Sequence, residues 1–446
     1  MLFNSFEYLL FLPLVYSLYW SVKSSRFRTM LLLVASYFFY GWWDWRFLGL
    51  IAASSLLDYF VGRQLGATEN TLRRKWLLAI SLTANLGLLM YFKYANFFLE
   101  SFLALSKSLG IQANVSSLSI ILPVGISFYT FQTLSYTIDV YRRTLPPERD
   151  LLNFATYVSF FPQLVAGPIE RAGRLLPQFR VLHRFDRGDA AIGIKQILWG
   201  LFLKTVIADN AATFVNHIFA EPGIMSSTTL MLGTVLFAFQ IYGDFAGYSE
   251  IAIGTARLFG FRLMTNFRYP YLSRDIAEFW RRWHISLSTW FRDYLYIPLG
   301  GSRGGRWVAL RNIIIIFLVS GFWHGANWTF VFWGLLNGLL FIPLYLLGRN
   351  RLHLDVVASR RSWLTVSELL NIGLTFTLVC ICWVFFRADS ITLALEYLGR
   401  MFSGAAGEYL LWSALPILGV IAVLMIIEWV NRRRGIYFAK SRRKVF

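Results

Sequence analysis

The sequence predicts an all-α integral membrane protein, on three observations. Of the 446 residues, 57% are hydrophobic and only 15% are charged, which is less charge than the surface of a soluble protein of this length needs. Apolar runs that approach the roughly 20 residues needed to cross a bilayer recur along the whole chain. Short clusters of Lys and Arg separate these runs. The pattern predicts about ten to twelve transmembrane helices, several of them short or interrupted.

The first predicted helix covers residues 6–20. No basic segment precedes this apolar stretch and no small-residue cleavage site follows it, so we interpret it as a retained helix and not as a signal peptide. The clearest of the later apolar runs are residues 29–45, 76–92, 191–208, 229–242, 327–347, 370–386 and 410–430.

Membrane topology explains most of the formal net charge of +19. Basic residues concentrate in the cytoplasmic loops of membrane proteins, so we expect the basic clusters to lie on the cytoplasmic side. This predicts an N-terminus outside the cytoplasmic membrane and a C-terminus inside, and no nucleic-acid partner is needed to account for the charge. The clusters are residues 23–28, 73–75, 142–149, 171–187, 303–311, 349–361 and 432–444.

The chain reads as one membrane domain, residues 1–446, because it contains no linker, low-complexity tract or internal repeat. The residue composition changes along the sequence. Residues 155–340 mix Gly, Pro, Trp, Arg and His at membrane depth, which a bilayer tolerates only where these groups are buried in protein or line a cavity. We therefore expect the functional region at about residues 155–340.

His324 is the strongest candidate for a reacting group among the five histidines. It follows an apolar run and is flanked by Gly321 and Gly325. At about 1.5 Å per helical residue, it lies roughly 20 Å into the membrane from the basic Arg311. An ionisable group at this depth indicates a functional site. A neutral imidazole there can accept a proton from a hydroxyl that attacks an acyl carbonyl; the alternative is a structural histidine that bonds to backbone.

The neighbours of His324 suggest orienting groups but no metal. Trp323, Asn327 and Trp328 are candidates for the walls of its pocket. No second His, Cys or carboxylate stands at ligand spacing from His324, so the site requires no metal.

A second histidine, His284, lies in the amphipathic segment 279–298. As one helix, this segment places Arg281, His284, Ser288 and Arg292 on one side and four apolar residues on the adjacent side. Guanidinium groups bind phosphates bidentately, so a re-entrant helix of this kind could receive an anionic substrate. An interfacial helix with snorkelling arginines explains the pattern almost equally well.

Three further segments are polar without a specific signature. The Gly-rich residues 299–306, with Arg303 and Arg306, form either an anion-binding turn or a flexible loop, and they lack the P-loop order. Residues 161–171 and 240–250 carry polar groups that serve either a tunnel or helix packing. These groups are Gln163, Glu170, Arg171, Asp244 and Ser249, and the carboxylates need partners such as Arg171 if they are buried.

The chain resembles the membrane-bound O-acyltransferases, and within them the bacterial branch of alginate O-acetylation proteins. The most specific blocks are FWRRWHISLS at residues 279–288 and FWHGANW at residues 322–328, which are distinctive when taken together. The other matching blocks are residues 1–13, 122–129, 162–169 and 244–249.

The resemblance implies a fold, a reaction and partners. The fold would be a ring of about ten to twelve transmembrane helices with re-entrant or interfacial helices around a central tunnel. His324 matches the catalytic histidine and His284 the second, polar residue of the motif. The protein would bind no cofactor. Its acyl donor would be acetyl-CoA from the bacterial cytoplasm. The acyl group would then pass across the inner membrane. The final acceptor would be an envelope polysaccharide, reached through a periplasmic or extracellular partner protein with a serine nucleophile.

We therefore expect acyl-CoA phosphates to meet a set of arginines on the cytoplasmic side while the thioester reaches His324. This set is Arg281, Arg282, Arg292, Arg303 and Arg306. A transporter or flippase for an anionic lipid-linked sugar is the rival hypothesis, since a polar tunnel with arginine clusters would serve it too. A catalytically silent scaffold ranks third. The sequence leaves open the acyl group, the acceptor polymer, the oligomeric state, and whether His324 is a base or a transient acyl carrier.

Overall fold

A computed structural model describes residues 1–111, 118–165 and 167–433, and this part of the chain is helical with no β-strand. It divides into two compact units: residues 1–194 with 252–264, and residues 195–251 with 265–446. Six helical stretches of the described residues are long and apolar enough to cross a membrane. These are Thr71–Ser108, Arg187–Ala220, Ser227–Leu258, Arg306–His324, Trp328–Leu346 and Val366–Arg387.

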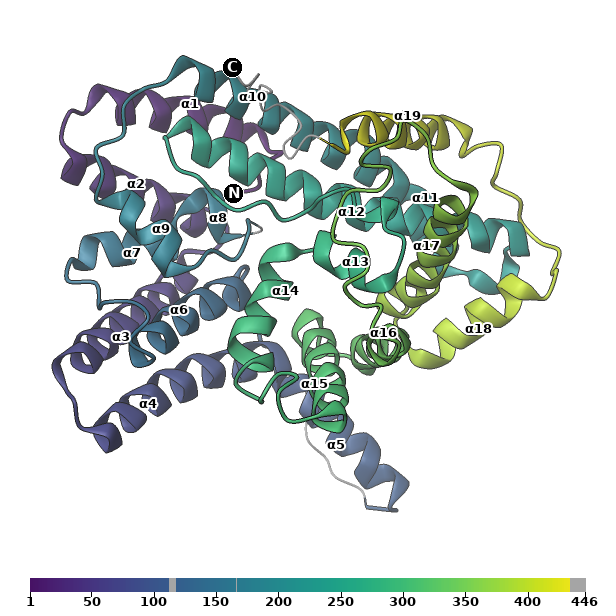
Figure 1. The fold of residues 1–446 in the computed structure, drawn as a ribbon, viewed down its shortest axis with the longest axis horizontal. Coiled ribbons are helices and arrows are strands. Elements are labelled where there is room, and N and C mark those ends of the chain that lie inside the picture. Colours follow the sequence, from purple (N-terminus) through teal and green to yellow (C-terminus); the bar gives the residue numbers. More distant parts are fainter. Residues whose placement is uncertain (112–117, 166, 434–446) are drawn as a thin grey trace. The chain divides into compact units, whose positions relative to one another are not determined.

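The first unit begins with helices that start at capping side chains. Ser5, Asn70 and Asp150 each accept a hydrogen bond from a backbone N–H of the helix that follows, which satisfies donors that have no partner inside the helix. The helices are α1 (Phe6–Ser21), α2 (Ser25–Gly41), α3 (Leu48–Ala67), α4 (Thr71–Leu89), α5 (Ala95–Ser108), α6 (Ile126–Tyr141), α7 (Leu151–Ser159), α8 (Phe161–Leu164) and α9 (Ala172–Phe179). In this unit α3 packs against α4, α6 and α7, and α2 packs against α7 (Figure 1). The start of α10 (Arg187–Leu201) and the end of α12 (Ser227–Leu258) also belong to it.

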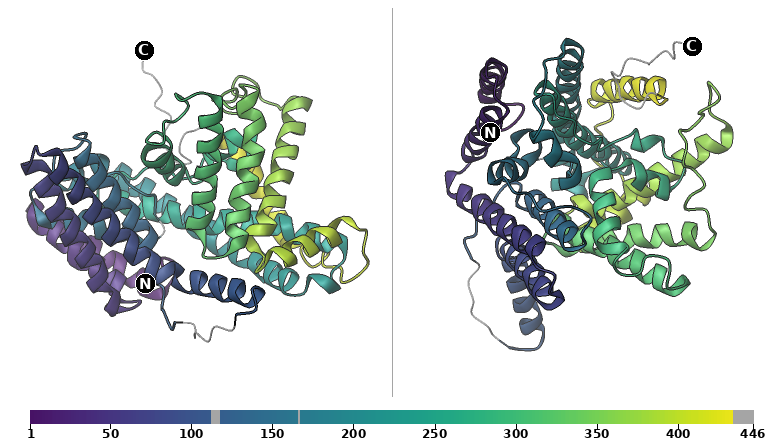
Figure 2. Two further views of the ribbon diagram at one scale, coloured as in Figure 1. Left: turned by 90° about the horizontal axis from the view of Figure 1, so that it is seen from below. Right: turned by 60° about the vertical axis from the view of Figure 1, so that its left-hand side comes forward.

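The second unit contains the rest of α10 and α12 together with eight further helices. These are α11 (Asp209–Ala220), α13 (Ile276–Arg282), α14 (Ile285–Phe291), α15 (Arg306–His324), α16 (Trp328–Leu346), α17 (Val366–Arg387), α18 (Ile391–Phe402) and α19 (Leu415–Asn431). The left view of Figure 2 shows α15, α16 and α17 side by side. Because Gly321 and Gly334 face each other across α15 and α16, the two backbones approach to a distance at which any Cβ would collide with the opposite chain.

The observed helices coincide with the predicted apolar runs, but the helix predicted over residues 279–298 is not continuous. Residues 6–20 form α1, and the runs at 29–45, 76–92, 327–347 and 370–386 match α2, α4, α16 and α17. The prediction of one helix over residues 279–298 is wrong. The chain leaves helical geometry at His284, whose φ of 44° is left-handed, and two short helices result, α13 and α14.

Three expectations stay predictions. The described residues contain six helical stretches suited to cross a membrane, so the number of ten to twelve crossings and their arrangement as a ring remain expectations. The organisation of the chain as a single domain also remains an expectation. The basic cluster predicted at residues 432–444 lies outside the described residues from position 434 onward.

Candidate active site

The turn that carries His284 is built by side chains of three segments of the second unit. Asp275 caps α13 by accepting a hydrogen bond of 2.6 Å from the backbone N–H of Glu278. Asn266 fixes the start of α14: its backbone carbonyl accepts from Ile285 N at 2.9 Å, and its side-chain oxygen accepts from the hydroxyl of Ser286 at 2.9 Å. These bonds hold His284 in a backbone conformation that costs about 1–3 kcal/mol in an ordinary residue.

Asn266 was not singled out by the sequence, although the predicted residue Ser249 leads to it. The amide nitrogen of Asn266 donates to the hydroxyl of Ser249 at 3.1 Å, and both side chains are buried. Ser249 thus acts through Asn266 on the turn at His284. No local pattern distinguishes Asn266 from any other loop asparagine, because its partners come from α12 and α14.

His284 is 1% exposed, and neither of its ring nitrogens has a hydrogen-bond partner within the described part of the chain. The ring packs edge-on against Phe245, with 4.5 Å between centroids. It also lies 6.0 Å from the ring of Trp323 and 6.3 Å from that of His324. A buried imidazole without partners is costly, so its nitrogens are suited to a group that is not part of the protein.

His324 is the last residue of α15 and lies in an aromatic enclosure. Its ring centroid is 4.9 Å from Trp323, 5.2 Å from Trp333 and 5.3 Å from Phe386. The close contact of α15 with α16 holds the end of α15, and therefore His324, against Trp333 of α16. His324 is half-buried, unlike His284.

A pocket of about 560 Å³ leads to His284 within the second unit. Arg281, His284, Ser288 and Arg292 all line it, together with Trp280 and Leu287 of the side predicted to be apolar. The break at His284 therefore brings residues of both predicted faces to the pocket. The opposite wall belongs to α15, where the lining ends at Ser320. His324 follows Ser320 by one helical turn, about 6 Å further along the axis.

Two of the five predicted arginines line this pocket. The guanidinium of Arg281 donates to the carbonyls of Asn350 and His353, at 2.7 and 2.9 Å, and that of Arg292 is exposed. Arg351, which the sequence did not single out, lines the pocket as well. It stands in a basic loop that we interpreted only as a topological signal, and the loop reaches the pocket through tertiary contacts.

The other three predicted arginines lie outside the pocket lining. Arg282 forms a buried ion pair of 2.6 Å with Glu278. Arg303 and Arg306 are exposed, in the turn before α15 and at its first residue. Arg282 also donates to the backbone carbonyl of Asp355 at 3.0 Å, which ties α13 to the loop that follows α16.

The three residues expected as walls for His324 have different environments. The buried ring of Trp323 contacts both histidines, with its centroid 6.0 Å from that of His284 and 4.9 Å from that of His324. Asn327 caps α16 by accepting from Thr329 N at 2.9 Å, and it donates to the carbonyl of Asp389 at 3.0 Å. Trp328 is 56% exposed at the start of α16.

The remaining predicted polar residues are distributed over both units. Gln163, Glu170 and Arg171 belong to the first unit, where Gln163 donates to the side chain of Gln132 at 2.9 Å. Glu170 accepts from the backbone N–H of Met264. Asp244, in the second unit, pairs with Lys204 at 2.6 Å and not with Arg171.

An ionic network stabilises α13 against the loop that follows α16. Arg274 contacts Glu278 at 3.0 Å and Asp355 at 3.0 Å. Burial by itself would raise the pKa of Asp355. Hydrogen bonds from Arg274 and Ser359 outweigh this and lower the pKa below its usual value. Across the described ranges, no group of three or more His, Cys, Asp or Glu side chains is arranged to hold a metal ion.

Comparison with known proteins assigns the chain to a family. The model of MBOAT, the membrane-bound O-acyltransferase family, matches residues 140–385. The chain is 43% identical to the probable alginate O-acetylase AlgI of Azotobacter vinelandii, over 90% of this chain and 78% of that protein. Identity to the protein of the same name in Pseudomonas putida is 42%, over 97% and 86% of the two chains. The peptidoglycan O-acetyltransferase of Helicobacter pylori is 37% identical, over 85% and 74%.

The matched range contains both histidines, and it extends through α13, α14, α15 and α16, which build the pocket. The resemblance seen in the sequence blocks is thus confirmed by a match over most of the chain and by six helices suited to a membrane. The chain belongs to the membrane-bound O-acyltransferase family and is an O-acyltransferase.

Proposed function

We propose that this O-acyltransferase moves an acetyl or other short acyl group from cytoplasmic acyl-CoA across the bacterial cytoplasmic membrane, for O-acylation of an envelope or extracellular polysaccharide. One observation carries the proposal. A pocket with Arg281, Arg292 and Arg351 in its lining ends at the buried His284, whose ring nitrogens have no hydrogen-bond partner among the described residues, and His324 lies immediately behind it.

The arginines of the pocket suit the phosphates of coenzyme A. Guanidinium groups bind phosphate oxygens bidentately and keep their charge at any physiological pH. Arg292 is exposed and Arg281 is half-buried, while His284 is fully buried, so charge lies toward the opening and the imidazole toward the interior. A donor that binds its phosphates at the opening directs its thioester inward.

The reaction moves one proton in two transfers through His324. The acceptor hydroxyl attacks the thioester carbonyl, a C–O bond forms and the C–S bond breaks. His324 takes the proton from the hydroxyl and returns it to the departing thiolate, which leaves as free coenzyme A. In this scheme His284, whose ring nitrogens make no hydrogen bond within residues 1–111, 118–165 and 167–433, orients the acyl carbonyl between the pocket and His324.

The position of His324 suits an acceptor that enters from the side opposite the donor. α15 begins at the basic Arg306 and ends at His324, and its length of 19 residues corresponds to about 28 Å, close to the hydrocarbon thickness of a bilayer. With the basic end in the cytoplasm, the acceptor is a serine of a periplasmic or extracellular partner protein, which passes the acyl group to the polysaccharide. The N-terminus is then outside, the C-terminus is inside, and the helices surround a central tunnel.

The names of the relatives support the acetyl group and the polysaccharide class. Two are alginate O-acetylases and one acts on peptidoglycan. We therefore take acetyl-CoA as the donor and an envelope glycan as the final acceptor, and leave the choice between alginate and another polymer to the partner protein.

The deciding experiment measures thiol release from acetyl-CoA by the purified protein in nanodiscs. Wild type is compared with His324→Ala and with His217→Ala, a matched control that removes an exposed histidine paired with Glu408 in the same unit. Release that needs His324 but not His217 supports the proposal. Absence of release in the presence of acceptor and partner, with movement of a lipid-linked sugar instead, would favour the transporter alternative.

A further inference from the structure

The first unit contains a second large pocket, which the acyl-transfer proposal does not use. Its volume is about 1150 Å³, and it lies between α2, α3, α7 and the loop before α7. This volume exceeds the roughly 300–1,000 Å³ typical of small-molecule sites. All of its lining residues precede position 181, so it is separate from the pocket at His284.

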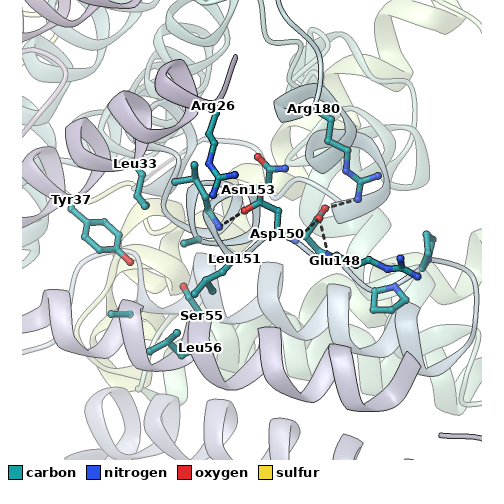
Figure 3. A pocket seen from close by; sticks show the side chains of 16 residues that line it. Arg26, Leu33, Tyr37, Ser55, Leu56, Glu148, Asp150, Leu151, Asn153 and Arg180 are labelled. Atoms are coloured by element: carbon teal, nitrogen blue, oxygen red, sulfur yellow. Dashed lines mark hydrogen bonds and ion pairs between the residues drawn. The ribbon is translucent and has the colours of Figure 1, made fainter. Parts of the chain in front are cut away.

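Basic residues stand at one edge of this pocket and apolar residues along its walls. Figure 3 shows Arg26 and Arg180 at the upper edge, Leu33 and Tyr37 at the left, and Leu56 at the lower edge. Arg26, Leu33 and Tyr37 lie on one face of α2, because their spacings of seven and four residues are multiples of the helical turn. From Arg26 to Tyr37 the pocket follows α2 for roughly 16 Å, about half the hydrocarbon thickness of a bilayer.

Two arginines of the pocket are free for a ligand. Glu148 accepts from Arg180 at 2.5 Å and from the backbone N–H groups of Arg149 and Asp150, so its charge is already balanced (Figure 3). Asp150 caps α7. Within the described part of the chain, the guanidinium groups of Arg26 and Arg149 have no hydrogen-bond or ion-pair partner, and both are exposed. With three arginines against the carboxylates of Glu148 and Asp150, the pocket lining carries one net positive charge.

The surface around the pocket is suited to lipid. The outward face of α2 carries Phe27, Met30, Val34 and Phe38, each between 46% and 62% exposed. Such a row of exposed apolar side chains is expected where a helix meets acyl chains. Leu56 on the pocket wall is itself 43% exposed, so the apolar lining continues into this surface.

We propose that this pocket binds one anionic phospholipid of the bilayer, with its phosphate at Arg26 and Arg149 and an acyl chain along Leu33, Tyr37 and Leu56. The length of the apolar wall matches one leaflet, and the excess positive charge matches an anionic headgroup at a membrane surface. The side chain of Asn153, which lines the same pocket and has no partner within the described residues, is available to the glycerol esters. Acyl-CoA shares the phosphate chemistry, but the lipid-facing apolar wall favours a membrane lipid.

Native mass spectrometry of the full protein, released from nanodiscs of phosphatidylglycerol and phosphatidylethanolamine, tests the proposal. Wild type should retain one phosphatidylglycerol molecule in preference to phosphatidylethanolamine. The double variant R26Q/R149Q should lower this retention about 30-fold, since each basic residue near a membrane surface contributes about fivefold to anionic-lipid binding. Leu56→Trp, which fills the wall, should also lower it.

The matched control is Arg187→Gln, which removes an exposed arginine of the first unit that does not line the pocket. It should retain lipid as wild type does. Equal retention by R26Q/R149Q and wild type, or loss of the bound lipid on addition of acetyl-CoA, would overturn the proposal. Both arginines are exposed, so this double variant should fold even if Leu56→Trp does not, which gel filtration checks. The assay needs no acyl transfer, so its result is independent of the proposed reaction.

Discussion

The rings of His284 and His324 lie 6.3 Å apart, although one follows α13 and the other ends α15. His284 faces the pocket and is fully buried, whereas His324 lies one turn beyond the pocket lining. The two imidazoles therefore have different access to a ligand, and this difference separates their expected roles.

Replacing His324 with Ala should lower kcat for acyl transfer by about 10²- to 10⁴-fold, the usual contribution of a general base or acid. The fold should persist, since the ring is only half-buried. Thiol release from acetyl-CoA gives the rate and circular dichroism the helical content. Turnover near that of wild type would contradict a role for His324 in proton transfer.

Two substitutions of His284 can distinguish the role of its backbone conformation from the role of its imidazole. Asn adopts left-handed geometry readily whereas Val does not, so His284→Val should cost about 1–2 kcal/mol more stability than His284→Asn. Both variants should lose most activity, because neither carries an imidazole. Thermal unfolding in detergent compares their stabilities, and an active Asn variant would show that the imidazole of His284 is dispensable.

Arg292 is expected to act on donor binding. Because it is exposed and lines the pocket, Arg292→Ala should raise KM for acetyl-CoA on the order of 3- to 10-fold with little change in kcat. Arg360→Ala, an exposed arginine of the second unit outside the pocket lining, is the matched control. Steady-state kinetics at low salt would detect the difference, and equal KM values for the two variants would place the phosphates elsewhere.

The contact of α15 with α16 leaves no room for a side chain at Gly321. The added Cβ of Gly321→Ala would collide with the carbonyl oxygen of Phe330, a backbone atom that cannot move aside. We expect a loss of about 1–3 kcal/mol or more in stability and a loss of activity, since His324 would shift. Gly373→Ala, in α17 with open space around it, should behave like wild type. Thermal unfolding and thiol release of the two variants, measured together, check this contrast.

The lowered pKa of Asp355 predicts a pH-dependent contribution to stability. The folded protein binds this proton more weakly than the unfolded chain, so the contribution is present above the unfolded pKa of about 3.9 and is lost as pH falls through the lower folded value. Asp355→Asn should therefore unfold at a lower temperature than wild type at neutral pH, and the gap should shrink toward pH ~3. A gap that is constant with pH would show that the charge of Asp355 does not stabilise the fold.

The sequence by itself determined the class of the protein and its family. Apolar run length and charge scarcity are local properties, and they identified helices such as α1, α2, α16 and α17 correctly. The residue blocks around His284 and His324 carried the resemblance to the acyltransferase family, which the comparisons confirmed. Arg281, His284, Ser288 and Arg292, which the periodicity of residues 279–298 grouped together, all line the pocket, but so do Trp280 and Leu287 of the predicted apolar side.

Tertiary structure decided what each of these residues touches. Arg281 and Arg282 are adjacent in the chain, yet one lines the pocket and the other pairs with Glu278, because successive residues of a helix point about 100° apart. The break at His284 depends on Asn266, whose partners come from other segments. A local pattern records which residues share a helix face; long-range packing determines which helix meets that face, and the sequence carries no direct record of it.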